Sequence, residues 1–303
     1  MPHPAPALQL ITTPGPADYA LLDSGRGRKL ERFGAIVVDR PEAQAIWQPR
    51  LPPAEWARAH AVFSASGEDD EKGKWRVDKP VPESWPVRID GVTMLSRLAG
   101  LWHLGLFPEQ LPHWQWMVER LGLASPLAGE ERQRVLNLFG YTGAASLLAV
   151  AAGAEVVHVD ASKKAVAWGR DNQAASGLAD RPLRWICEDA RKFVAREVRR
   201  GRSYHVIVID PPKFGRGTDG EVWELFEHLP ALLADCARLL APTQSHLILT
   251  AYAIRASALT LDGLMRETLE PRGGTIESGE LALAERDGHR LIGTSLYSRW
   301  SAP

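Results

Sequence analysis

The sequence predicts an α/β fold in which a small β-rich domain precedes a mostly parallel sheet with an antiparallel last strand. Early in the chain, apolar runs are short and interrupted by Pro, Gly and charged residues, as in β-rich domains. From about Arg134 onward strand-like and helix-like segments alternate, which indicates a parallel sheet covered on both faces. Two consecutive strands at the end of the chain predict a hairpin that finishes this sheet. We therefore expect domains at residues 1–95 and 96–303.

The N-terminal domain contains few recognisable elements. Phe33–Asp39 is typical of a strand, Pro52–Ala61 of a short helix, and Glu68–Lys74 of a charged turn between two short strands. The domain is a candidate for substrate recognition because its aromatic residues could stack on bases, although most are better explained as core. These aromatic residues are Trp47, Trp56, Trp75 and Trp85.

The second domain contains the alternating elements. The helix expected at Ser162–Gly177 illustrates the criteria, because it begins at a Ser cap and ends at a Gly. The expected strands are 134–139, 155–160, 183–187, 204–210, 245–250, 275–283 and 291–300. The expected helices are 143–152, 162–177, 190–200, 221–240 and 255–269.

Composition indicates a globular, cytoplasmic protein without a membrane partner. Hydrophobic residues make up 45% of the 303 residues and charged residues 24%, and no apolar run approaches the length of a membrane span. Two cysteines, Cys187 and Cys236, are too few for a disulfide framework or a cysteine metal site. His103 and His113 have no partner at metal-ligand spacing, so no metal is expected. The sequence does not predict the oligomeric state.

The net charge of −1 argues against a large nucleic-acid footprint, because nucleic-acid-binding proteins often carry a clear basic excess. Local basic strips remain, and each is more simply explained as a solvated face. One strip contains Arg26, Arg28, Lys29 and Arg32, and the other contains Arg191, Lys192, Arg196, Arg199, Arg200 and Arg202.

The residues directly after the strands are the candidates for ligand binding, because ligands of open α/β sheets sit outside the carboxyl ends of the strands. The first strand is followed by a turn with the spacing Gly140-x-x-Gly143. Two glycines in such a turn allow a ligand to approach the backbone closely. The spacing differs from the dinucleotide fingerprint. A turn needed only for the fold is an equally good explanation.

Acidic residues follow the next two strands. Asp160 lies 20 residues after Gly140, about the distance at which a carboxylate accepts hydrogen bonds from ribose hydroxyls. Glu188 and Asp189 follow the third strand, where one of them could accept from an adenine amino group, and we favour Asp189. Each acid could instead cap the helix that follows it.

Asp210-Pro211-Pro212 after the fourth strand is the most informative stretch. Proline has no N–H and fixes φ, and each residue before a proline is pushed toward an extended conformation. Asp210 and Pro211 therefore present carbonyls with no N–H donors at the next two positions. Such a rigid group of acceptors suits a substrate that offers N–H groups, as a nucleobase does.

These stretches resemble the class I S-adenosylmethionine-dependent methyltransferases, whose sheet is Rossmann-like. The resemblance is closest to the bacterial large-subunit ribosomal RNA enzymes that make 5-methylcytosine or 7-methylguanine. It lies in NLFGYTGAAS at 137–146, VVHVDASKKAVAWGRDNQAASG at 156–177, EDARKF at 188–193, DPPKF at 210–214 and GLFPEQ at 105–110.

The resemblance implies S-adenosylmethionine as cofactor and RNA as partner. The implied cofactor-binding residues are Asn137, Phe139, Gly140, Tyr141, Thr142, Gly143, Asp160, Ala161, Ser162, Asp189, Ala190 and Asp210, with Gln110 closing over the cofactor. The implied catalytic residues, which face the target base, are Asp210, Pro211, Pro212 and Lys213.

Two departures from the family pattern bear on the chemistry. The cytosine-5 enzymes need a catalytic cysteine just after the fifth strand, and here residues 249–253 read LTAYA. Cys187 falls in the third strand, where it is expected to be buried, and Cys236 falls in a helix as a packing residue. In amino-methylating relatives an aromatic residue follows the two prolines, whereas here Lys213 does, with Phe214 next. The missing cysteine argues against cytosine-5 chemistry and favours methyl transfer to a base nitrogen. The second departure leaves open which residue stacks on such a base: Lys213 could contact a phosphate, and Phe214 could stack.

Two other functions remain open. A methyltransferase acting on a small molecule or a protein would suit the near-neutral charge. A nicotinamide-dependent oxidoreductase would also use a Rossmann-like sheet, but the glycine spacing and the Asp-Pro-Pro segment argue against it.

Overall fold

A computed structural model describes residues 7–66, 69–100, 102–123, 132–252, 254–287 and 290–302. These residues form two compact units. The sheet unit comprises the chain up to Ile11, Pro112–Leu281, and the chain from Thr294 onward. The β-rich unit comprises Thr12–Leu111 and Ala282–Gly293. Its boundary thus falls after Leu111 rather than after residue 95, and it includes the tip of the C-terminal hairpin.

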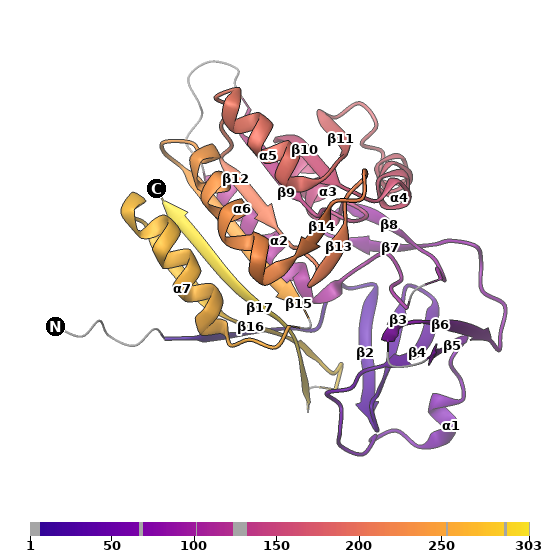
Figure 1. Ribbon diagram of the computed structural model, residues 1–303. Helices are drawn as coiled ribbons and strands as arrows, with labels where there is room; N and C mark the ends of the chain where they lie inside the picture. Colours follow the sequence, from indigo (N-terminus) through magenta and orange to yellow (C-terminus); the bar gives the residue numbers. More distant parts are fainter. Residues whose placement is uncertain are drawn as a thin grey trace. The chain divides into compact units, whose positions relative to one another are not determined.

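The sheet of the first unit has the strand order β1-β16-β17-β15-β12-β9-β10-β11 (Figure 1). Strands β9, β10, β11, β12 and β15 are parallel, and β17 is antiparallel to β15, as the sequence predicts. The strands are β1 (Gln9–Thr13), β9 (Arg134–Leu138), β10 (Glu155–Asp160), β11 (Leu183–Cys187), β12 (Val206–Ile209), β15 (Ser245–Tyr252), β16 (Thr275–Ala284) and β17 (Leu291–Ala302).

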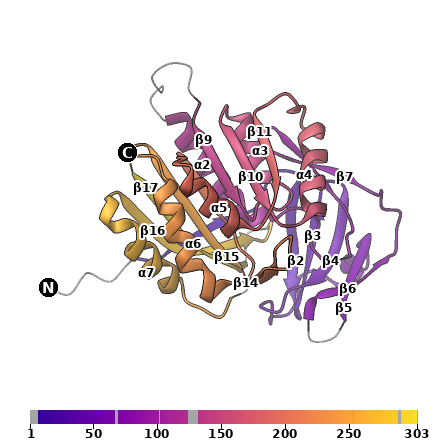
Figure 2. The ribbon, with the colours of Figure 1, turned by 45° about the horizontal axis from the view of Figure 1, so that its top comes forward.

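Helices cover both faces of this sheet. Helices α5, α6 and α7 lie side by side on one face (Figures 1 and 2). Helices α2, α3 and α4 cover the other face, where they contact the strand residues His246, His158 and Trp185 respectively. The helices are α2 (Leu111–Leu123), α3 (Ala144–Ala151), α4 (Lys163–Ala175), α5 (Ala190–Arg199), α6 (Leu225–Leu239) and α7 (Ala258–Leu269), with 3-10 turns η1 (Pro108–Gln110) and η2 (Glu270–Arg272). No described helix is long and apolar enough to cross a membrane.

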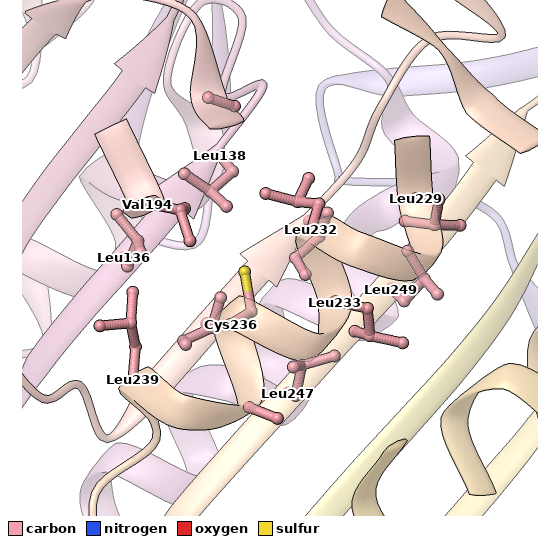
Figure 3. Close-up of a cluster of buried hydrophobic side chains, with 14 of the residues drawn as sticks. Leu136, Leu138, Val194, Leu229, Leu232, Leu233, Cys236, Leu239, Leu247 and Leu249 are labelled. Carbon is pink, nitrogen blue, oxygen red and sulfur yellow. The ribbon is translucent and has the colours of Figure 1, made fainter. Parts of the chain in front are cut away.

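The core of the sheet unit lies between the central strands and α6. Alternate residues of β9, among them Leu136 and Leu138, point toward this helix (Figure 3). Cys236 of α6 lies among them and is completely buried, as expected of a packing residue. Its burial raises the thiol pKa, so the side chain is an inert apolar group.

The chain direction changes between β9 and β12. From β9 the sheet grows through β10 to β11, and the chain then returns to add β12 and β15 on the other side. The carboxyl ends of β9 and β12 therefore lie next to each other at a topological switch point, where open α/β sheets bind their ligands. The predicted glycine turn follows β9 and the predicted Asp-Pro-Pro segment follows β12.

The β-rich unit has a five-stranded sheet of order β2-β3-β4-β5-β6 and the hairpin β7–β8. Ser24 donates a hydrogen bond to Glu285, which ties the tip of the C-terminal hairpin to this unit. The elements are β2 (Tyr19–Gly25), β3 (Arg28–Phe33), β4 (Ile36–Pro41), α1 (Pro53–Trp56), β5 (Ala61–Ser66), β6 (Asp69–Val77), β7 (Trp85–Ile89) and β8 (Val92–Ser96).

Several predicted elements are wrong. Phe33–Asp39 is not one strand, because Phe33 ends β3 and a turn at Gly34, whose φ is 57°, leads into β4. The predicted charged turn is strand through residues 69–74, paired with β5, while Glu68 lies outside the described residues. Helix α1 is only the first part of Pro52–Ala61. The helix predicted from Glu221 begins at Leu225, because the preceding residues form β14 (Val222–Glu224).

A buried ion-pair network holds the β-rich sheet together. Glu31 is fully buried and accepts hydrogen bonds from Arg40 at 2.7 and 2.8 Å and from Tyr19 at 2.8 Å. Burial raises the pKa of Glu31, but the charges of Arg40 and Lys29 outweigh this effect and hold it below its ordinary value. Arg40 also donates to the Trp102 carbonyl at 3.0 Å. The guanidinium therefore joins β3, β4 and the segment that leads out of the unit.

We expect Arg40→Met to lower the free energy of unfolding by about 3–5 kcal/mol, because it leaves the Glu31 carboxylate buried without its main partner. Urea unfolding followed by tryptophan fluorescence measures the change. Arg58→Met is the matched control, since the Arg58–Glu55 pair is exposed and contributes less than about 1 kcal/mol. Equal stability of the two variants would contradict the assignment.

Candidate active site

The turn after β9 has an unusual backbone. Phe139, Tyr141 and Gly143 have φ values of 55°, 51° and 90°. The first two are not glycines, and a bulky residue in the left-handed region costs of order 1 kcal/mol or more. Such conformations persist where the surrounding structure enforces them, commonly at binding sites.

The two glycines of this turn are required by close approach of neighbouring side chains. A Cβ on Gly140 would lie 2.4 Å from the Cε1 atom of His158, and one on Gly143 would lie 2.6 Å from the Trp185 ring. Both rings come from the adjacent strands β10 and β11. The glycine spacing therefore reflects packing against the sheet as well as space for a ligand.

A buried polar network supports the turn from below. Asn137 donates to the Ser146 hydroxyl at 2.9 Å, and this hydroxyl lies 3.0 Å from His158 Nδ1. Burial lowers the pKa of His158 to about 3, so the ring is neutral. Asn137 is predicted to contact the cofactor, and the structure places its side chain in this network. Ser146 and His158 were not predicted, although a His within the apolar run of β10 is a signal.

Asp160 ends β10 and organises the backbone around it. Its two carboxylate oxygens accept the Tyr141 N–H at 2.9 Å and the Ser162 N–H at 2.8 Å. Burial raises its pKa above the ordinary value, and these two donors oppose the rise. Ser162 itself caps α4 by accepting from the Ala165 N–H. Asp160 thus links the glycine turn to the start of α4 and does not cap that helix.

Asp189 is buried and caps α5. Its Oδ1 atom accepts the N–H groups of Arg191 and Lys192 at 2.9 and 3.1 Å. Its neighbour Glu188 is held by Arg196 in a two-pronged ion pair. Arg196 therefore binds both oxygens of Glu188, whereas the cap uses only one oxygen of Asp189 and leaves Oδ2 for another donor. Ala190, the first residue of α5, is buried beside it.

Asp210 follows β12 and lies across the switch point from the glycine turn, with its N–H directed at the Leu138 carbonyl at 3.4 Å. Its carboxylate accepts a hydrogen bond from the Thr250 hydroxyl of β15. Burial raises the pKa of Asp210 to about 6, while the Thr250 hydrogen bond opposes the rise. The carboxyl group therefore exchanges its proton near neutral pH. The sequence analysis did not identify Thr250 as its partner.

The two prolines lead into a short hairpin, β13 (Phe214–Arg216) and β14, which the sequence analysis did not predict. Pro211 is buried and Pro212 is exposed. The Pro212 carbonyl accepts the indole N–H of Trp223 at 2.7 Å, and the Trp223 ring lies 4.9 Å from the Phe139 ring. Trp223 thus joins the Asp-Pro-Pro segment to the glycine turn. The side chain of Lys213 is exposed.

Three residues singled out from the sequence remain, namely Cys187, Gln110 and Thr142. Cys187 was expected to be buried and is half-buried, with its thiol 3.6 Å from the Ala161 carbonyl. Gln110 lies in η1 of the β-rich unit, where it is buried. Thr142 is buried within the glycine turn, and its carbonyl accepts from Asn172 of α4 at 2.9 Å.

The parallel sheet with its antiparallel β17, the strained glycine turn and the acids at three strand ends define a class I methyltransferase-type fold. A family model described as S-adenosylmethionine-dependent methyltransferase matches residues 52–270. A solved S-adenosylmethionine-dependent methyltransferase from Agrobacterium tumefaciens is 48% identical, with a TM-score of 0.91, over 98% of this chain and 95% of that chain. The chain belongs to the S-adenosylmethionine-dependent methyltransferase family.

Relatives with named substrates share a shorter segment. Ribosomal RNA large subunit methyltransferase K/L of Shewanella baltica (strain OS195) is 36% identical over 125 residues, which are 40% of this chain and 17% of the relative. Ribosomal RNA large subunit methyltransferase I of Aeromonas salmonicida (strain A449) is 41% identical over 83 residues, 27% of this chain and 21% of the relative. The matches thus span about a fifth of the length of these relatives.

The residues at the switch point fit S-adenosylmethionine, the cofactor of the family. Each Asp160 oxygen accepts one backbone N–H and retains a lone pair for a ribose hydroxyl. Asp189 uses Oδ1 to cap α5, so Oδ2 would be left for an amino group such as that of adenine. The glycines leave the turn without side chains where the methionine part of the cofactor would lie.

We expect Gly143→Ala to destabilise the protein and weaken S-adenosylmethionine binding, because the new Cβ meets Trp185 in a left-handed turn. Gly153→Ala is the matched control, since Gly153 has φ 98° and open space around it. Both variants incur the left-handed cost of about 1–2 kcal/mol, and the clash adds about 1–3 kcal/mol in Gly143→Ala alone. Calorimetric melting and cofactor titration measure the difference. Identical behaviour of the two variants would show that the contact with Trp185 is unimportant.

Proposed function

We propose that this protein is an RNA methyltransferase that modifies a base nitrogen of ribosomal RNA. The observation that carries the proposal is the Asp210-Pro211-Pro212 segment, which sets a half-buried carboxyl group next to the glycine turn at the switch point. The named relatives, which are ribosomal RNA large subunit methyltransferases, support RNA as the substrate class. An enzyme with this substrate would act in the cytoplasm.

In this proposal the cofactor lies along the carboxyl ends of β9, β10 and β11. The glycine turn holds its methionine part, Asp160 its ribose and Asp189 its adenine. Ala161 and Ser162 add contacts beside Asp160. The sulfonium supplies an electrophilic methyl group, so no covalent nucleophile from the protein is needed. The protein aligns the acceptor and excludes water.

Asp210 orients the target base and accepts a proton from it. A carboxylate accepts hydrogen bonds from N–H groups, and a pKa near 6 lets this group hold the proton that the nitrogen loses. Pro211 and Pro212 keep the segment extended, and Lys213, exposed at its end, is placed for a phosphate.

The arrangement does not favour transfer to cytosine C5. That route needs a cysteine nucleophile near the base, and β15, which carries Thr250 beside Asp210, contains no cysteine. Cys187 lies on β11, two strands beyond β9 in the sheet, and Cys236 is in the core. A nitrogen acceptor needs only the alignment and proton acceptance described above.

A second candidate is methylation of a small molecule or a protein. The net charge of −1 favours it, because the chain has no overall basic excess with which to attract RNA.

The deciding experiment is transfer of a labelled methyl group from S-adenosylmethionine to total RNA from cells that lack the gene, with a protein and metabolite extract in parallel. Label in RNA, found in a nitrogen-methylated base after digestion, is the expected result. Label as 5-methylcytosine would overturn the proposed acceptor. Label only in the parallel extract would favour the second candidate.

We expect Asp160→Asn to weaken S-adenosylmethionine binding by roughly tenfold or more, because the charged acceptor for the ribose hydroxyls is lost. Isothermal titration measures the dissociation constant. Asp180→Asn is the control, since Asp180 is exposed in the turn after α4. The role fails if both variants bind the cofactor like the wild type.

We expect Asp210→Asn to lower kcat by roughly 100-fold or more while cofactor binding persists. In the wild type, kcat should rise with pH through an apparent pKa of about 6, as Asp210 becomes ionised.

The same carboxyl group should make the stability of the protein depend on pH. Its pKa is raised in the folded state, so the neutral carboxyl stabilises the fold at low pH, and this contribution is lost as pH rises through about 6. The variant should therefore be more stable than the wild type at pH 8, by about 1–2 kcal/mol, and not at pH 4. Unchanged turnover in the variant would exclude Asp210 from catalysis.

A further inference from the structure

The hairpin β13–β14 begins directly after the Asp-Pro-Pro-Lys segment and has two different faces. Phe214 pairs with Glu224, Gly215 with Trp223, and Arg216 with Val222. Since side chains alternate along each strand, Trp223 lies on one face and the other two pairs lie on the opposite face.

The inner face is anchored to the active site. Trp223 is 3% exposed, donates to the Pro212 carbonyl and packs on Phe139 of the glycine turn. The N–H of Leu225, where α6 begins, donates to the Lys213 carbonyl at 3.0 Å and closes the base of the hairpin. The position of the outer face is therefore fixed relative to Asp210.

Helix α5 holds the hairpin from the side. Arg191 donates to the Val222 carbonyl at 2.8 Å, and Lys192 forms ion pairs with Asp219 and Glu221 of the connecting loop. Lys192 offsets part of the negative charge of these two acids, and its hydrogen bond lowers the pKa of Glu221 to about 2. The basic residues at the start of α5 thus position the hairpin.

The outer face presents a combination of groups to solvent. Phe214 is 53% exposed and Val222 is 41% exposed, and the side chains of Arg216 and Glu224 are exposed beside them. Within the part of the chain that the structure describes, neither Arg216 nor Glu224 has an ion-pair partner. An exposed aromatic ring with a free cation and a free carboxylate as neighbours contributes little to folding and suits a polar, flat ligand.

We propose that this outer face binds a nucleotide of single-stranded RNA that flanks the target base. The Phe214 ring stacks on the flanking base, and Glu224, directly opposite Phe214, accepts a hydrogen bond from an exocyclic amino group of that base. Arg216, two residues along on the same face, binds the neighbouring phosphate. This inference rests on the proposed RNA substrate and adds where, and by which chemistry, the RNA beyond the target base is held.

Single-stranded RNA accounts for the face better than a peptide does. Stacking needs one open aromatic ring, and Phe214 supplies it; of the other three residues in the two outer pairs, two are charged and one, Val222, is apolar. The carboxylate beside the ring selects bases with an amino group, such as cytosine, over uracil. Arg216 supplies the counter-charge for a phosphate.

The test compares Phe214→Ala with Phe226→Ala. Phe226 is equally exposed, at 55%, but lies in the first turn of α6 and outside the hairpin. Binding of fluorescent cytidine and uridine 12-mers is measured by anisotropy, and KM and kcat are measured with the RNA that the wild type methylates. Phe214→Ala should weaken binding and raise KM by roughly 5- to 150-fold, with cofactor affinity unchanged, and Phe214→Trp should restore both. Phe226→Ala should resemble the wild type.

Two further variants separate the other groups. Glu224→Gln should reduce the preference of the wild type for the cytidine 12-mer over the uridine 12-mer. Arg216→Ala should weaken both oligonucleotides equally and lower the salt dependence of binding by about one unit of the log–log slope.

The outcomes distinguish this inference from the proposed function. If the wild type methylates RNA and Phe214→Ala matches Phe226→Ala in KM and oligonucleotide affinity, the flanking-nucleotide inference is wrong and the function stands. If the wild type transfers no label to RNA and binds neither oligonucleotide, the proposed function and the inference are both wrong. Loss of binding in Phe214→Ala with recovery in Phe214→Trp supports the inference.

Discussion

The left-handed backbone of the β9–α3 turn is the constraint on which the rest of the site depends. Phe139 and Tyr141 occupy conformations that their side chains disfavour, and contacts from three directions hold them there. Asp160 binds the Tyr141 N–H, the Asn137–Ser146–His158 network fills the space below, and Trp223 packs on Phe139. The same turn therefore meets the second strand, the helix layer and the hairpin. A change in any of these contacts alters the backbone that faces the cofactor.

Three of the acids at the strand ends combine a structural bond with a free acceptor. Asp160 orders the turn, Asp189 caps α5 and Asp210 takes the Thr250 hydroxyl. These bonds fix the orientation of the carboxylates before any ligand arrives, which lowers the entropy lost on binding. The helix-cap and ligand interpretations of Asp189 are compatible for this reason, since a carboxylate offers more acceptor positions than a cap uses.

Regular periodicity made the sheet unit predictable. Strand 155–160 matched the structure to the residue, because a buried parallel strand is a short apolar run bounded by polar residues. The β13–β14 hairpin could not be predicted, because its three-residue strands contain Gly215 and depend on Trp223 reaching Pro212 and Phe139, residues distant in sequence. In the β-rich unit, strand β6 is the last strand of its sheet and pairs only with β5. Its many charged residues indicated a turn rather than a strand. Thr250 binds Asp210 and His158 binds Ser146, and both are tertiary contacts that spacing does not reveal.

The charge distribution explains how a chain with a net charge of −1 could act on RNA. Four of the six cations in the strip at residues 191–202 are engaged within the protein: Arg191 and Lys192 hold the hairpin, Arg196 neutralises Glu188, and Arg200 pairs with Glu197. These groups are therefore poor sources of the counterion release that drives nonspecific nucleic-acid binding. Affinity must then come from a few groups next to the reaction centre. The Phe214 ring and the Arg216 guanidinium of the proposed RNA-binding face meet this requirement. Stacking depends little on salt, so binding that relies on Phe214 would vary less with ionic strength than binding by a basic surface.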